Sequence, residues 1–275
     1  MTGRRRFLHR VAMAAGAVPA ILAGARRAAA GQVSIPSEFD TSLESIAASF
    51  RSGGAITLGY LSQPIMQGMY PGVMLAHDRS GLTTRAQGTT RNVAAAGFIT
   101  LSPDFLSRLG GTASFRGVEA DVNRAIESVA PETIVTIAGG AIAYVKSMKR
   151  VNGRIGALGF GWGGGAVLTS ALAHPEIGAC VVVDADIPPT LKSPERIRAP
   201  LLVILAGEDA AAVKGIAPLE AALEKHQRPH TVKVFPGVQR GFHDPGAAKL
   251  YNAAAAKEAW TMITQHFEMH LKGKA

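Results

Sequence analysis

The sequence of 275 residues has little charge and almost no cysteine: Asp, Glu, Lys and Arg make up 18% of it, and Cys180 is the single cysteine. One cysteine excludes an intramolecular disulfide framework, so a hydrophobic core must stabilise the fold. The hydrophobic share of 47% is ample for such a core. The sequence also lacks a fixed-period repeat and a strongly biased segment, which excludes solenoid, coiled-coil and disordered chains.

The formal net charge of +9 is concentrated at the N-terminus. Six of the 29 Lys and Arg residues precede Gly31, and no Asp or Glu does. From Gly31 onward, 23 basic residues face 20 acidic ones. Because this part of the chain is nearly neutral, it has no general electrostatic attraction for a polyanion, and we expect no nucleic-acid partner.

Residues 1–30 have the pattern of an export signal, because a basic start precedes an apolar stretch from Val11 to Ala25 and then small residues. The stretch of about 15 residues is shorter than the roughly 20 that a bilayer core requires, so we expect no permanent membrane span. The start, Arg4-Arg5-Arg6-Phe7-Leu8, resembles the twin-arginine consensus. We therefore expect that export machinery recognises residues 1–30 and that cleavage after Ala25 or Ala30 leaves a periplasmic or secreted bacterial protein. An uncleaved amphipathic anchor is the alternative.

Apolar runs typical of strands alternate with helical segments along the rest of the chain. We expect strands at 55–61, 72–76, 97–101, 154–158, 178–183, 201–205 and 231–235. We expect helices at 85–96, 118–129, 132–148, 166–174, 210–226 and 251–271. This alternation predicts an α/β fold in which helices flank both faces of a mostly parallel central sheet. No linker divides it, so we expect one domain at 55–275, preceded by an N-terminal extension at 31–54.

A glycine cluster, Gly159-Phe160-Gly161-Trp162-Gly163-Gly164, lies between an expected strand and an expected helix. It permits three interpretations. The first is close packing at a tight turn. The second is dinucleotide binding, since Gly159, Gly161 and Gly164 satisfy G-x-G-x-x-G and Asp184 follows about 20 residues later. Trp162 weakens this interpretation, because its indole would stand where the backbone must approach a pyrophosphate.

The third interpretation is a nucleophile elbow, in which a strained strand-to-helix turn presents the nucleophile above the sheet. The chain then needs an acid after a later strand and a histidine after the last one. Asp209 follows the strand expected at 201–205, and His243 follows the strand expected at 231–235. The order elbow, acid, histidine is the one found in α/β-hydrolases.

These motifs resemble the dienelactone hydrolase family over nearly the whole chain after residue 54. The matching segments are 71–78, Gly81-Leu82, 96–98, 101–106, the elbow, 199–202, Asp209, 237–239, Gly241-Phe242-His243 and 251–255. The resemblance implies an α/β-hydrolase fold, a small ester or lactone as the binding partner, and neither a metal nor an organic cofactor.

Two positions depart from the family's pattern. The central elbow residue is a cysteine in the family, and here it is Gly161, which has no side chain with which to attack a carbonyl. Asp78 stands where the family usually has a glutamate that contacts the resting nucleophile. By the resemblance, Asp209 and His243 match the acid and the base, and the backbone N–H groups of Trp162 and Arg79 match the oxyanion donors.

Three hypotheses follow for the remaining machinery. The protein is a non-catalytic descendant that keeps a small-molecule pocket, or it is a weak hydrolase in which His243, oriented by Asp209, activates water directly. In the third, another nucleophile such as Ser80 or Ser102 is recruited, although neither occupies an elbow pattern. The dinucleotide-binding interpretation also stays open.

Overall fold

A computed structural model describes residues 36–37, 39–188 and 191–273 of the chain. The strands are β1 (Leu43–Ser52), β2 (Ala55–Pro64), β3 (Tyr70–Ala76), β4 (Ile99–Pro103), β5 (Val151–Phe160), β6 (Ile177–Val183), β7 (Leu201–Ala206) and β8 (His230–Phe235). The α-helices are α1 (Thr84–Ala95), α2 (Glu119–Glu127), α3 (Pro131–Ser147), α4 (Trp162–Ala173), α5 (Ala210–Lys225) and α6 (Ala253–Leu271). Short 3₁₀ turns lie at Ser107–Leu109, Thr112–Phe115 and Pro194–Arg196. The expected export signal at residues 1–30 lies outside the described residues.

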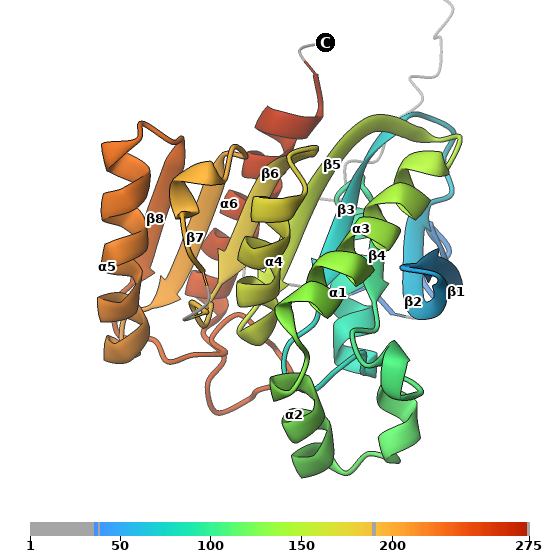
Figure 1. Ribbon diagram of the computed structural model, residues 1–275, viewed down its shortest axis with the longest axis horizontal. Coiled ribbons are helices and arrows are strands. Elements are labelled where there is room, and N and C mark those ends of the chain that lie inside the picture. The colour runs from blue at the N-terminus through green and yellow to red at the C-terminus, as the bar shows by residue number, and fades with distance from the viewer. Residues whose placement is uncertain (1–35, 38, 189–190, 274–275) are drawn as a thin grey trace, which may run out of the picture. The chain divides into compact units, whose positions relative to one another are not determined.

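Within the described residues the strands form one sheet in the order β1-β2-β4-β3-β5-β6-β7-β8 (Figure 1). β1 pairs antiparallel with β2, and β2 antiparallel with β4, whereas every pairing from β4 to β8 is parallel. The expectation of a mostly parallel sheet is therefore confirmed. Its parallel strands all end at the same edge, where the loops that follow them meet.

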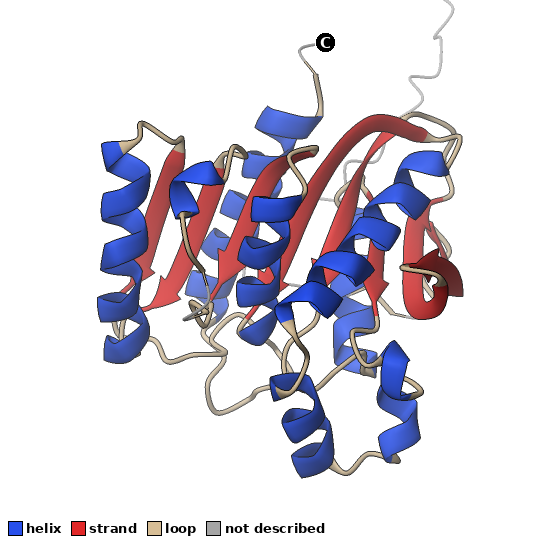
Figure 2. Ribbon diagram, in the orientation of Figure 1, coloured by secondary structure: helices blue, strands red, loops and turns tan. Residues whose placement is uncertain are grey.

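Helices cover both faces of this sheet, since blue helices lie in front of and behind the red strands in Figure 2. One face packs against α3, α4 and α5 in a core that includes Met74 and Ala76. The other face packs against α1 and α6 in a second core that includes Val73 and Leu75. Successive residues of β3 thus point to opposite cores, which is why the central strands are apolar throughout.

Two differences from the expected boundaries bear on the extent of the domain and on the site. The segment at 31–54, expected to precede the domain, supplies β1, which pairs with β2 along its full length from Leu43 to Ser52. Its polar outer face hides the strand from a search for apolar runs. Helix α4 begins at Trp162 rather than at residue 166, because the glycines of the cluster already form its first turn. No single helix of the described residues is long and apolar enough to cross a membrane, although the bent pair of α2 and α3 meets the length and hydropathy requirement together.

Candidate functional site

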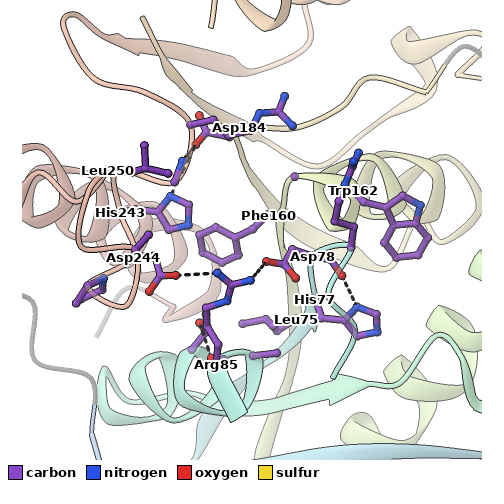
Figure 3. Close-up of a pocket in the computed structure, with 18 of the residues that line it drawn as sticks. Leu75, His77, Asp78, Arg85, Phe160, Trp162, Asp184, His243, Asp244 and Leu250 are labelled. Atoms are coloured by element: carbon purple, nitrogen blue, oxygen red, sulfur yellow. Dashed lines mark hydrogen bonds and ion pairs between the residues drawn. The ribbon is translucent and has the colours of Figure 1, made fainter. Parts of the chain in front are cut away.

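A pocket of about 230 Å³ opens at the carboxyl edge of the sheet. Loops after β3, β5, β6 and β8 contribute to its lining, together with residues of α1 and α6. Figure 3 shows how their side chains converge from these separate elements. Gly161, His243, Asp78, Arg79 and Trp162 all line this pocket, so the structure brings five of the six predicted site residues together. Asp209 is not among the residues that line it.

The turn between β5 and α4 has the geometry of a nucleophile elbow. Gly161 at its apex has φ 54° and ψ −120°, a conformation that residues with a β-carbon adopt only at a cost. Its N–H donates to the carbonyl of Val183 at 2.9 Å, and its carbonyl accepts from Gly164 at 3.0 Å. A β-carbon added at Gly161 would have no heavy atom within 4 Å, so the apex faces open space.

The glycines beside the apex are required by close packing. A β-carbon at Gly159 would collide with the carbonyl of Gly163, and one at Gly163 would collide with the carbonyls of Ala76 and His77. Strand β5, the start of α4 and the end of β3 therefore approach one another as closely as backbones can. This packing explains the G-x-G-x-G spacing and fixes where the apex stands.

His243 lies in the loop after β8, with its side chain 17% exposed. Its ring stacks on Phe160 at a centroid distance of 4.7 Å. Burial lowers the pKa of His243 below the usual value, although the carboxylates of Asp184, Asp244 and Asp78 oppose this shift and Arg85 adds to it. The imidazole is therefore neutral at pH 7 and retains a nitrogen lone pair.

Asp209 does not contact His243, contrary to the sequence expectation. Its Oδ1 accepts from the N–H of Ala212 at 3.0 Å and caps α5, and its Oδ2 accepts from Nε of Arg240 at 2.9 Å. The hydrogen bond from Ala212, followed by the contact with Arg240, holds the pKa of Asp209 below its usual value. The carboxylate nearest the ring is instead that of Asp184, whose Oδ2 lies 3.8 Å from Nδ1 of His243.

Asp78 lies in the pocket as expected, but its partners were not anticipated. Its Oδ2 accepts from Nη2 of Arg85 at 2.9 Å, and Nη1 of the same arginine lies 3.0 Å from Oδ2 of Asp244. Figure 3 shows Arg85 between the two carboxylates. Arg85 thus joins the loop after β3 to the loop that carries His243. A single arginine in a helix gave no sequence signal for this role, because the partners are distant in the chain.

Two backbone N–H groups are available as oxyanion donors. That of Trp162 is at the first position of α4, where a helix has no internal acceptor for it. Neither this N–H nor that of Arg79 donates to a backbone carbonyl among the described residues. The Arg79 side chain forms ion pairs with Glu127 and Asp186, each at 3.6 Å. A carbonyl oxygen above Gly161 would meet the positive end of α4.

Asp184 also lines the pocket, whereas the other sequence candidates lie outside it. Asp184 is 2% exposed, and its oxygens accept from the N–H groups of Ala206 and Gly241, so it does not present a free carboxylate to a ribose. Ser102 is fully buried in β4, and Ser80 does not line the pocket. The described residues contain one group spaced to hold a metal ion, Glu220, Glu224 and His230, and none of these lines the pocket.

A mostly parallel sheet with helices on both faces, a strained turn after β5 and a histidine loop after β8 define an α/β-hydrolase fold. The model of the dienelactone hydrolase family matches residues 58–271, and the chain belongs to that family. A Synechocystis protein named "Putative carboxymethylenebutenolidase" is 27% identical over 228 residues, which cover 78% of this chain and 92% of that protein.

Solved structures agree with the fold. A Klebsiella pneumoniae protein described as "Putative Dienelactone Hydrolase" superposes with a TM-score of 0.73 at 19% identity, covering 83% of this chain and 99% of that one. A dienelactone hydrolase from Anabaena variabilis gives a TM-score of 0.65 at 23% identity, covering 84% of this chain and 99% of that one.

Proposed function

We propose that this protein binds small esters or lactones in the pocket without forming an acyl-enzyme. The observation that carries the proposal is the apex of the elbow: Gly161 keeps the elbow conformation and faces open space, yet has no nucleophilic atom. The family and the name of the Synechocystis relative favour an ester or lactone as the ligand. A carbonyl oxygen would accept from the N–H groups of Trp162 and Arg79, and Phe160 and Trp260 would contact the apolar part of the ligand.

A second candidate is slow hydrolysis by water, which the neutral imidazole of His243 favours. In this reaction His243 removes a proton from water as the water oxygen attacks the carbonyl carbon, and the carbonyl electrons move onto an oxygen held by the two N–H groups. The tetrahedral intermediate then collapses, the C–O bond to the leaving group breaks, and His243 returns the proton to it. Enzymes that have lost a triad residue retain roughly 10³–10⁴-fold acceleration over water, which sets the scale expected here.

The test is an assay on p-nitrophenyl acetate with the protein from Gly31 onward, Gly161→Cys and His243→Ala. We expect a burst of nitrophenol in Gly161→Cys, because a thiol at the apex would form an acyl-enzyme, and no burst in the other two proteins. The native thiol does not interfere, because Cys180 is fully buried and burial raises its pKa to about 12.

Wild-type turnover that His243→Ala abolishes would establish the second candidate. Saturable binding of the ester without turnover would establish the first. A burst in the wild-type protein would contradict both, because it requires a nucleophile other than residue 161.

We also propose that the chain is exported, which rests on the basic and apolar pattern of residues 1–30. The double substitution Arg4→Lys and Arg5→Lys should abolish accumulation in the periplasm of a bacterial host while leaving the cytoplasmic amount of folded protein. Unchanged periplasmic accumulation would show that the twin arginines are not the export signal.

A further inference from the structure

We infer that Asp184, at the end of β6, is the carboxylate that positions His243, and that Asp209 does not serve this role. The inference deepens the proposed function, because it names the partner of the histidine in the same pocket. It differs from the order read from the sequence, in which the acid follows β7 rather than β6.

The first argument is the distance between the two side chains. Oδ2 of Asp184 lies 3.8 Å from Nδ1 of His243, and this Nδ1 is buried without a hydrogen-bond partner among the described residues. A buried ring nitrogen without a partner costs free energy, and a small rotation of the imidazole would bring Nδ1–H onto this carboxylate. The arrangement therefore favours the tautomer with the proton on Nδ1 and the lone pair on Nε2.

The second argument is that the carboxylate of Asp184 is held in place. Its Oδ1 accepts from the N–H of Ala206 at 2.8 Å, and its Oδ2 accepts from the N–H of Gly241 at 3.1 Å. The first bond fixes it to the end of β7, and the second fixes it to the loop that carries His243. Because the side chain is 2% exposed, water does not compete for the lone pair that remains on Oδ2.

The third argument is backbone strain. Asp184 has φ 48°, an unfavourable conformation for a residue with a β-carbon, and its N–H donates to the carbonyl of Ile204 at 2.8 Å. Strain of this kind persists only where the surrounding structure enforces it, and it occurs often at functional sites. Here it coincides with a carboxylate that connects β6, β7 and the histidine loop.

Asp209 is engaged elsewhere. Both of its oxygens accept hydrogen bonds, from Ala212 and from Arg240, and Nη1 of Arg240 in turn donates to Asp186 at 2.8 Å. This pairing places Asp209 in a charge network with Arg240 and Asp186, and Asp209 does not line the pocket that holds His243.

The inference is tested by measuring the tautomer and titration of the His243 ring by ¹⁵N NMR in the ligand-free protein. His243→Gln assigns the signal, Asp184→Asn removes one charge, and Asp209→Asn is the matched control. Asparagine suits position 184, because its Oδ1 can still accept from Ala206 and because it tolerates positive φ.

We expect the wild-type ring to carry its proton on Nδ1. Asp184→Asn should lower the pKa of His243 further and shift the tautomer toward Nε2–H, because an anion that favours the imidazolium is gone. Asp209→Asn should change neither. Asp244, Asp78 and Arg85 also act on this ring and remain intact in both variants.

An Nε2–H tautomer in the wild-type protein would overturn the inference, and this measurement needs no variant to fold. A change in Asp209→Asn without one in Asp184→Asn would also overturn it. Melting curves of both variants separate loss of the charge from loss of the fold. Because no ester is present, failure of the proposed function in the p-nitrophenyl acetate assay leaves this result unaffected.

Discussion

At the scale of single residues, Gly161 couples the loss of a nucleophile to relief of strain. The elbow conformation, with φ 54°, is costly for any residue with a β-carbon, and glycine adopts it freely. In an active hydrolase the nucleophile would bear that cost at the apex. Here the turn is kept by the flanking glycines and by the bonds to Val183 and Gly164, so the fold does not depend on a side chain at the apex.

This coupling predicts that Gly161→Ala destabilises the protein by about 1–3 kcal/mol, from backbone strain alone. Gly215→Ala is a matched control, because both added β-carbons would have no heavy atom within 4 Å, but Gly215 lies inside α5. Gly215→Ala should stabilise the protein by about 1 kcal/mol, since alanine is a better helix former than glycine. Urea unfolding monitored by tryptophan fluorescence measures both changes in stability. Gly161→Cys should also lose stability. A higher free energy of unfolding in either Gly161 variant than in the wild type would contradict the elbow geometry.

At the scale of elements, the close approach of α4 to β3 determines where the pocket forms. Gly163 lies in the first turn of α4, directly against the carbonyls of Ala76 and His77. These residues end β3 and lead into the loop that carries Asp78 and Arg79. The contact therefore sets the distance between the two candidate oxyanion donors.

Gly163→Ala should therefore lower the free energy of unfolding by about 3 kcal/mol or more, because backbone atoms cannot move aside as a flexible side chain can. Helix propensity alone predicts the opposite sign, a gain of about 1 kcal/mol, which Gly215→Ala in α5 is expected to show. Urea unfolding of the two variants compares them directly. Equal stabilisation by both would mean that α4 does not pack on the end of β3 as the structure has it.

Local sequence pattern was enough to predict most elements but not the first strand. The central strands are apolar on both faces, and that pattern differs clearly from loops. β1 is an edge strand in which only Ala48, Phe50 and Ser52 are buried, so its sequence resembles a polar extension. The elbow was predictable because its glycines are required by backbone contacts that recur with fixed spacing.

At the scale of the whole molecule, sequence order could not decide which acid accompanies His243. Asp184 and Asp209 both follow parallel strands, and such strands deliver their loops to one edge of the sheet. The structure separates the two through Arg240, which binds Asp209, and through Gly241, which binds Asp184. These contacts join segments distant in the chain, and no local pattern reports them.

The stability of the whole fold should fall in mild acid because of His266, which links α6 to the start of β7 through a hydrogen bond of 3.1 Å with the carbonyl of Pro200. Burial, with a further contribution from His270, lowers the pKa of His266 from 6.5 to about 4. The unfolded chain therefore binds this proton as pH falls through 6.5, whereas the folded protein binds it only near pH 4. The unfolding free energy contributed by His266 is complete above pH 6.5 and is lost toward pH 4, by about 1–3 kcal/mol.

His266→Gln, which keeps a donor for Pro200, should flatten this dependence in urea unfolding between pH 7 and pH 4. The exposed His226→Gln should follow the wild-type curve, and since His243 acts in the same direction in all three proteins, the difference isolates His266. Parallel curves for wild type and His266→Gln would show that this ring is not buried against β7.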